Sequence, residues 1–285
     1  MSDPTPTPRG PATDAKLLGE VTPPRPPATG TPQAVAAKLI NGVDLDPWCK
    51  VLIYADPGAG KTKFAATAPK PLFIDTENST ETLRDWPELA AECKIVRLQG
   101  WSDLDSIVAA LRGGDPEYSD RQTLVIDTIS ELQRRNLDEL LDDRARNNSS
   151  RSRFLAHQQD YKESGEMMRR ITTAFRDLPM HLVVLSHARE VNNDGKLVMR
   201  PDLTPKLQDT MRGIFGLQGF MFESNDDWNA PFKNYLQTRS NAVIQAKTRY
   251  RHLPALIENP TFDMILEASS RYLHEQPQQP TSEKE

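Results

Sequence analysis

Short apolar runs alternate with longer amphipathic segments through the middle of the chain. Five runs rich in β-branched residues, V-L-I-Y-A, P-L-F-I-D, K-I-V-R-L, T-L-V-I-D and H-L-V-V-L-S, begin at residues 51, 71, 94, 123 and 181. Runs that are apolar at nearly every position are typical of strands buried on both faces of a parallel sheet. The segments between them predict helices near 61–68, 79–92, 102–112, 129–146 and 154–178. The alternation therefore predicts an α/β fold, with a mainly parallel central sheet flanked by helices.

The pattern changes after residue 187. The segment N-N-D-G-K at 192–196 lies between two extended runs, and Asp-Gly in that setting predicts a β-hairpin. Further extended runs, G-F-M-F-E, Y-L-Q-T-R and A-V-I-Q-A-K, begin at 219, 235 and 242. We expect them to add antiparallel strands at one edge of the sheet.

Both ends of the chain differ in composition from this alternating core. Residues 1–33 contain nine prolines and almost no large apolar side chains, so we expect a disordered tail there. Residues 275–285 are polar and predict a second loose tail, which leaves one core domain at 34–274. No apolar run approaches the roughly 20 residues of a membrane span. We therefore expect no membrane partner. Two cysteines without metal-ligand spacing favour a cytoplasmic location.

The sequence Y-A-D-P-G-A-G-K-T at 54–62 follows the first apolar run and precedes a helical segment. A glycine-rich loop between a strand and a helix binds phosphate through its backbone N–H groups. Lys61 would reach the β- and γ-phosphates, and the Thr62 hydroxyl would coordinate Mg²⁺. Ala55 replaces the first glycine of the usual motif, but it is nearly as small. The loop predicts ATP and Mg²⁺ as ligands, with nucleotide contacts from Asp56, Pro57, Gly58, Ala59, Gly60, Lys61, Thr62 and Lys63.

Acidic residues end two of the other predicted strands. Asp127 ends T-L-V-I-D and is a candidate for the Mg²⁺ shell, with a helix N-cap as the alternative. F-I-D-T-E at 73–77 places Asp75 and Glu77 at the end of the strand after the phosphate loop. Glu77 is the candidate that orients or activates the attacking water. The alternative is that Asp75 or Glu77 only caps the helix that starts near Ser79.

Two further strand ends carry polar or basic groups. Ser186 and His187 end the 181 strand and could hydrogen-bond the γ-phosphate or the attacking water, although a histidine at a strand end is often structural. Lys247 and Arg249 in A-K-T-R lie on the same side of an extended run, because side chains alternate along a strand. Together they could act as an arginine finger does on a neighbouring subunit's phosphate. The alternative is a solvated basic strand end.

In this order the motifs resemble those of RecA-type core P-loop ATPases, over about residues 45–265. Within that group the chain looks like the phage-encoded Sak-type ATPases of single-strand annealing and recombination. The resemblance implies a RecA-like fold, hydrolysis of ATP with Lys61 and Glu77 as catalytic residues, and Asp127 for Mg²⁺. It also implies that Ser186 and His187 sense the γ-phosphate and that Lys247 and Arg249 act in trans. The sensor strand departs from the recombinases by lacking their usual amide residue.

If the resemblance holds, DNA should contact loops beyond the carboxyl edge of the sheet. A net charge of −5 argues against extensive coating by nucleic acid, so any DNA site must be a local basic patch. Two segments qualify, 134–153 and 188–206, with Phe154 and Tyr161 as nearby aromatics. The alternative for each is a solvated helix face or loop. The candidate residues are Arg144, Arg146, Arg151 and Arg153 in the first, and Arg189, Lys196 and Arg200 in the second.

The sequence thus favours an oligomeric, DNA-dependent ATPase that binds single-stranded DNA in the cytoplasm of a host cell and promotes annealing or strand exchange. A single-strand DNA-binding protein is a further candidate partner. One alternative in the same fold is a ring helicase or its loader. A P-loop kinase would use the arginines at 144–153 as a lid, and an ATP-switched scaffold would result if Glu77 is only a cap.

Overall fold

A computed structural model describes residues 47–193, 195–225 and 230–274 of the chain. The predicted tails, 1–33 and 275–285, lie outside the described residues, as do the first residues of the predicted core, 34–46. Among the helices of the described ranges, none combines the length and the apolar character that crossing a bilayer requires.

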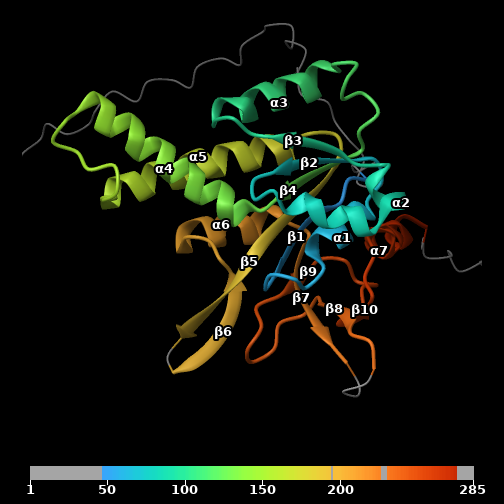
Figure 1. Cartoon of the computed structure of the whole chain (residues 1–285). Helices are drawn as coiled ribbons and strands as arrows, with labels where there is room; N and C mark the ends of the chain where they lie inside the picture. Colours follow the sequence, from blue (N-terminus) through green and yellow to red (C-terminus); the bar gives the residue numbers. More distant parts are fainter. Residues whose placement is uncertain (1–46, 194, 226–229, 275–285) are drawn as a thin grey trace, which may run out of the picture. The chain divides into compact units, whose positions relative to one another are not determined.

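The described strands form one ten-stranded sheet (Figure 1). Eight of them follow the order β10-β8-β7-β1-β5-β4-β2-β3, while β6 pairs with β5 and β9 pairs with β7 outside this order. Strand β5 separates β1 from β4, and every pair from β1 to β3 along this order is parallel. The predicted fold class, a mainly parallel sheet flanked by helices, is confirmed. The five strands on this side are β1 (Lys50–Ala55), β2 (Pro71–Asp75), β3 (Lys94–Arg97), β4 (Thr123–Asp127) and β5 (His181–Asn193).

The second half of the chain adds antiparallel strands, as predicted. The hairpin around 192–196 and the strand near 235 are confirmed, but two other expected strands differ from the prediction. Strand β7 (Leu217–Ser224) was expected at an antiparallel edge, yet it pairs parallel with β1, because Leu217–Met221 is apolar enough to be buried inside the sheet. The expected strand at 242–247 is also wrong. The Asn241 side chain accepts hydrogen bonds from the backbone of Val243 and Ile244 and fixes a turn there. The antiparallel strands are β6 (Lys196–Pro201), β8 (Lys233–Gln237), β9 (Lys247–Thr248) and β10 (Leu256–Glu258).

Helices cover both faces of the sheet. One face carries α3 (Ser102–Gly113), α4 (Ile129–Asn147), α5 (Gln158–Arg176) and α6 (Pro205–Ile214), and the other carries α1 (Lys61–Ala66), the 3₁₀ helix η1 (Ser79–Asp85), α2 (Pro87–Ala90) and α7 (Phe262–His274). The expected single helix at 79–92 is broken where Pro87 begins α2. Helices α6 and α7 and strand β10 were not predicted.

Side chains alternate across each central strand, so the sheet separates two apolar clusters. Leu52 and Tyr54 of β1 face the cluster under α3 to α6, whereas Val51 and Ile53 face the cluster under α1 and α7. Burial of both faces explains why the central strands are apolar at nearly every position. Polar side chains gather at the carboxyl ends of β1, β2 and β4, and at the middle of β5 beside them. Ser186 and His187 were expected to end their strand, but β5 continues to Asn193 because it pairs with β6.

His181 anchors the start of β5 from inside the second cluster. Its ring lies edge-on to Trp48 and Phe262, and its Nδ1 accepts a hydrogen bond of 3.0 Å from the Cys49 backbone. Burial, with a smaller effect from the charge of Lys50, lowers the pKa of His181 to about 4. The neutral ring is therefore the form that fits the folded protein.

We expect His181→Asn to reduce the loss of stability in acid. In the unfolded chain this histidine takes up a proton near its usual pKa of 6.5, whereas the folded protein resists protonation until about 4. The free energy of unfolding should therefore fall as the pH drops through that window, by about 2 to 3 kcal/mol. Urea unfolding at pH 7 and 4.5 measures the difference. Equal acid sensitivity in both proteins would contradict this origin.

Candidate functional site

The phosphate loop joins the carboxyl end of β1 to the first turn of α1. Gly58 and Gly60 have φ angles of 86° and 84°, in the left-handed region that favours glycine. A Cβ atom on Gly60 would also lie 2.9 Å from Nδ2 of Asn234. That nitrogen donates a 3.2 Å hydrogen bond to the Ala59 carbonyl. Asn234 of β8 thus fastens the loop, a contact that no sequence motif indicated.

A cavity of about 210 Å³ opens at this loop and brings distant segments together. The phosphate loop, both predicted acids and His187 all contribute to its wall. Trp86 and Thr82 also line it, and Lys63 Nζ lies 4.7 Å from the centre of the Trp86 ring, so the wall offers an aromatic face that sequence reasoning missed. The lining residues are Pro57, Gly58, Gly60, Lys61, Thr62, Lys63, Glu77, Ser79, Thr82, Trp86, Asp127, Thr128 and His187. Of the predicted nucleotide contacts, Asp56 and Ala59 lie outside this lining.

Lys61 is buried beside its own loop. Its ammonium group donates hydrogen bonds of 3.1 and 2.9 Å to the carbonyls of Ala55 and Asp56. Burial lowers the pKa of Lys61, although the carboxylates of Asp127 and Glu77 act against this effect. Since these hydrogen-bond partners are neutral, the Lys61 ammonium group can donate to phosphate oxygens instead without breaking an ion pair.

Asp127 ends β4 directly below the phosphate loop. Its Oδ2 accepts hydrogen bonds from the hydroxyls of Thr62 at 2.8 Å and Ser79 at 2.9 Å. The N-cap of α4 is Thr128, whose hydroxyl accepts a hydrogen bond from Glu131, so the cap interpretation of Asp127 is wrong. Burial raises the pKa of Asp127 to about 6, although the two hydroxyls oppose it. A carboxylate and a hydroxyl so close together fit the oxygen ligands that Mg²⁺ prefers.

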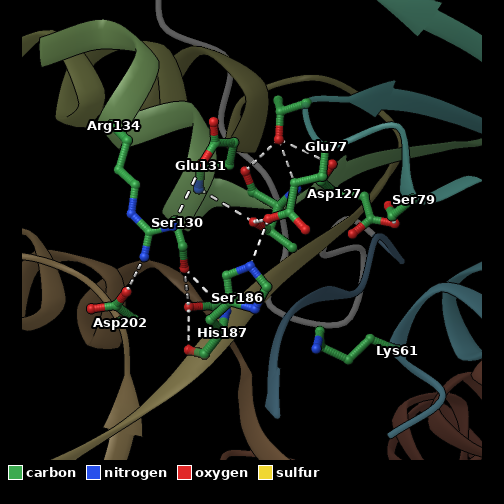
Figure 2. A network of polar contacts seen from close by, with 12 residues as sticks. Lys61, Glu77, Ser79, Asp127, Ser130, Glu131, Arg134, Ser186, His187 and Asp202 are labelled. Atoms are coloured by element: carbon green, nitrogen blue, oxygen red, sulfur yellow. Dashed lines mark hydrogen bonds and ion pairs between the residues drawn. The ribbon is translucent and has the colours of Figure 1, made fainter. Parts of the chain in front are cut away.

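The two acids of the D-T-E segment have different roles. Asp75 is buried and accepts hydrogen bonds from the backbone of Glu77 and Ser79, both at 3.2 Å, and from the Thr80 hydroxyl at 2.5 Å. Asp75 therefore fixes the start of η1, although the N-cap residue itself is Asn78. Glu77 points into the cavity instead, where its Oε1 lies 2.7 Å from Nε2 of His187 (Figure 2).

Hydrogen bonds from two neighbours and the charge of a third residue keep Glu77 ionised. The Thr128 hydroxyl donates to Oε1 of Glu77, the same oxygen that His187 contacts. Burial alone would raise the pKa of Glu77, but these hydrogen bonds and the charge of Lys61 outweigh it, and the pKa falls below its usual value. Nδ1 of His187 is buried and lacks a hydrogen-bond partner among the described side chains. A carboxylate held in this way can accept a proton from a water molecule in the cavity.

Ser186 and His187 face different ways at the end of the cavity. Ser186 is fully buried, and its hydroxyl lies 2.9 Å from the hydroxyl of Ser130 in the first turn of α4. Ser130 also accepts a hydrogen bond from the backbone N–H of His187. Only His187 of this predicted pair lines the cavity, while Ser186 fastens β5 to α4.

Lys247 and Arg249 lie far from the phosphate loop of their own chain. Lys247 pairs with Gln218 of β7, and Gln218 pairs with Leu52, near the amino end of β1. The phosphate loop follows the opposite, carboxyl end. Lys247 donates to the Arg212 carbonyl, and Arg249 donates to the Gly213 carbonyl at 3.0 Å, so both cations contact the last turn of α6. Neither lines the cavity at the phosphate loop of the same subunit.

Carboxylates of the same chain neutralise the first basic segment. Asp160 is fully buried at the start of α5, where Arg151 contacts it at 2.7 Å and Arg144 forms a second ion pair. Arg146 pairs with Asp143, and Arg153 pairs with Asp142 at 2.8 Å. Arg144 and Arg151 thus fix the turn between α4 and α5.

The second basic segment is the hairpin of β5 and β6, which Figure 1 shows extending beyond the rest of the sheet. Arg189 is exposed and lies 3.5 Å from Asp202. Lys196 is exposed and makes no ion pair within the described ranges. The Nε atom of Arg200 is buried without a hydrogen-bond partner there. The hairpin therefore retains more unneutralised positive charge than the turn between α4 and α5.

Comparison with known proteins identifies a family for most of the chain. A family model described as an AAA domain matches residues 49–250. Among solved structures, a KaiC-like protein, PH0186 from the hyperthermophilic archaeon Pyrococcus horikoshii OT3, is 16% identical over 74% of this chain and 84% of its own, with a TM-score of 0.42. A search of curated proteins finds no significant match.

Proposed function

We propose, from the premise that the chain belongs to the AAA domain family and is a P-loop ATPase, that it hydrolyses ATP in response to single-stranded DNA during phage-type recombination or annealing. The contact between Glu77 and His187 carries this proposal. His187 lies in β5, and the same strand continues into the basic β5–β6 hairpin. A ligand that moves the hairpin would therefore act on the carboxylate that faces the ATP cavity.

Five side chains of the cavity would take part in hydrolysis together with the loop backbone. The backbone N–H groups of the loop and the Lys61 ammonium would bind the phosphates. Thr62 and Asp127 would hold Mg²⁺, which supplies positive charge that stabilises the charge developing on phosphate oxygens. Glu77 would orient the attacking water and accept its proton. His187 would fix the position of Glu77.

DNA would bind the β5–β6 hairpin rather than the turn between α4 and α5. Phosphate contacts need cations whose charge is not already used within the protein. Lys196 is exposed on the hairpin and makes no ion pair within the described ranges. Arg189 is also exposed, and its partner Asp202, at 3.5 Å, is shared with Arg134, which lies closer at 2.7 Å. Arg146 and Arg153, by contrast, each pair with an aspartate beside them. The exposed side chain of Phe154 could still stack on a base beside this turn.

We expect the double substitution Arg189→Ala and Lys196→Ala to weaken binding to single-stranded DNA about tenfold at low salt. Losing two phosphate contacts should also reduce the slope of log affinity against log salt concentration by about 1.4. Arg146→Ala with Arg153→Ala removes the same charge and is the matched control, expected within about twofold of wild type. Anisotropy of a labelled oligonucleotide, with a non-hydrolysable ATP analogue, measures both. The reverse ranking would place DNA at the α4–α5 turn instead.

The ATP site would be completed by a second copy of the chain. Within the described ranges, no arginine lines the cavity, and Lys61 and Lys63 are the two lysines of its lining. Lys247 and Arg249 are two cations held on α6 away from their own phosphate loop. In a homo-oligomer they would stabilise transition-state charge on the phosphate of the adjacent subunit, as an arginine finger does.

A further inference from the structure

Tyr54 occupies the position directly before the phosphate loop, and its side chain is fully buried. The ring packs against Phe220 with 5.1 Å between centroids. The hydroxyl lies 3.0 Å from the Met199 carbonyl and 2.8 Å from the Gln245 carbonyl. Tyr54 has one hydroxyl proton, so these two carbonyls share a single donor.

One carbonyl belongs to strand β6 and the other to the segment that is hydrogen-bonded to it. Met199 lies in the middle of β6, and its N–H donates to the Val243 carbonyl at 2.7 Å. The Gln245 N–H in turn donates to the Met199 carbonyl at 3.1 Å. The segment 241–246 is thus bound along β6, and the Tyr54 hydroxyl joins both to β1.

Neither carbonyl depends on Tyr54 alone. The Gln245 carbonyl also accepts a hydrogen bond of 3.0 Å from the Gln218 side chain, and the Met199 carbonyl keeps the Gln245 N–H. Removing the hydroxyl would therefore leave no buried carbonyl without a donor. Strand β5 of the hairpin already pairs with β1, so the particular effect of the hydroxyl is to connect the strand of the phosphate loop with β6.

We propose that Tyr54 is a positioning residue that holds β6 against the phosphate-loop strand, so that nucleotide binding restrains the β5–β6 hairpin. Besides the backbone pairing of β1 with β5, two side-chain links then join the hairpin to the ATP site. Strand β5 is linked through His187 to Glu77, and β6 through Tyr54 to the start of the loop. This inference rests on the proposed coupling between the ATP site and the hairpin.

Hydrogen–deuterium exchange of the Tyr54→Phe protein tests this role. In wild type, a non-hydrolysable ATP analogue should slow exchange of the β6 amides. Tyr54→Phe keeps the ring and should bind the analogue within about twofold of wild type, since the hydroxyl touches no loop atom. It should nevertheless lose the slowing in β6 and keep it in β5. Gln218→Leu removes the other donor to Gln245 and is the matched control, which should respond as wild type does.

Each other outcome has a definite meaning. Persistent slowing in β6 of Tyr54→Phe, or the same loss in Gln218→Leu, overturns the particular role of Tyr54. A lower melting temperature with an unchanged nucleotide response assigns Tyr54 a structural role only and overturns the proposal. Wild type that binds the analogue without any change in the hairpin overturns the coupling and this inference with it. Wild type whose hairpin responds, but which binds no single-stranded DNA, overturns the proposed function and leaves the role of Tyr54 standing.

Discussion

Replacing Glu77 with glutamine is expected to lower the rate of ATP hydrolysis by about 100-fold or more, which is the usual contribution of a general base. Glutamine keeps the size of the side chain and can still hydrogen-bond Thr128 and His187, but it cannot accept a proton from water. The affinity for ATP should stay close to wild type, because the loop, Lys61 and Thr62 are unchanged. Steady-state turnover and nucleotide titration separate the two quantities.

Glu81→Gln is the matched control for this substitution. Glu81 is an exposed carboxylate on η1, outside the cavity lining, and its replacement should leave turnover unchanged. Wild-type turnover in Glu77→Gln would show that Glu77 only shapes the cavity. The chain would then act as a switch that binds ATP, with hydrolysis depending on other groups.

Replacing Arg249 with alanine is expected to lower hydrolysis about 1,000-fold, the lower end of the effect of an arginine finger. The substitution leaves the ATP cavity of its own subunit intact, since Arg249 does not line that cavity and its guanidinium donates to the Gly213 carbonyl of α6. ATP binding should therefore persist. Lys61→Ala should also be inactive, because it lacks the phosphate-binding ammonium.

Mixing these two inactive proteins distinguishes a shared site from a damaged fold. A contact between Arg249→Ala, which keeps its phosphate loop, and Lys61→Ala, which keeps its arginine, rebuilds one complete site. Random pairing gives about one such contact in four, so about a quarter of wild-type turnover should return. Native mass spectrometry verifies that mixed oligomers form. Mixed oligomers without recovered turnover would contradict the role in trans.

The local signals of the sequence were sufficient for the fold class and the phosphate loop. A strand, a glycine-rich loop and a helix are adjacent in sequence, so 54–62 could be assigned without tertiary information. The roles of Asp75 and Glu77 could not. Both follow the same strand, and what separates them is contact with Thr128 and His187, which lie 51 and 110 residues from Glu77.

Other contacts between separate segments could not be predicted from local sequence either. The arginines near 144–153 form a basic cluster in sequence, but nothing local shows that Arg144 and Arg151 both contact a buried Asp160. Strand β7 was misplaced because its partner, β1, precedes it by more than 150 residues. Asn234 and Trp86 approach the cavity through the fold alone, since neither belongs to a recognisable motif.

Turnover of ATP with and without single-stranded DNA tests the central claim most directly. At low salt, with Mg²⁺ present, wild type should hydrolyse ATP several-fold faster when DNA is added, and the stimulation should fade as salt rises. Lys61→Ala should show no turnover in either condition. Equal wild-type turnover with and without DNA, at a DNA concentration that saturates binding, would contradict a DNA-dependent ATPase.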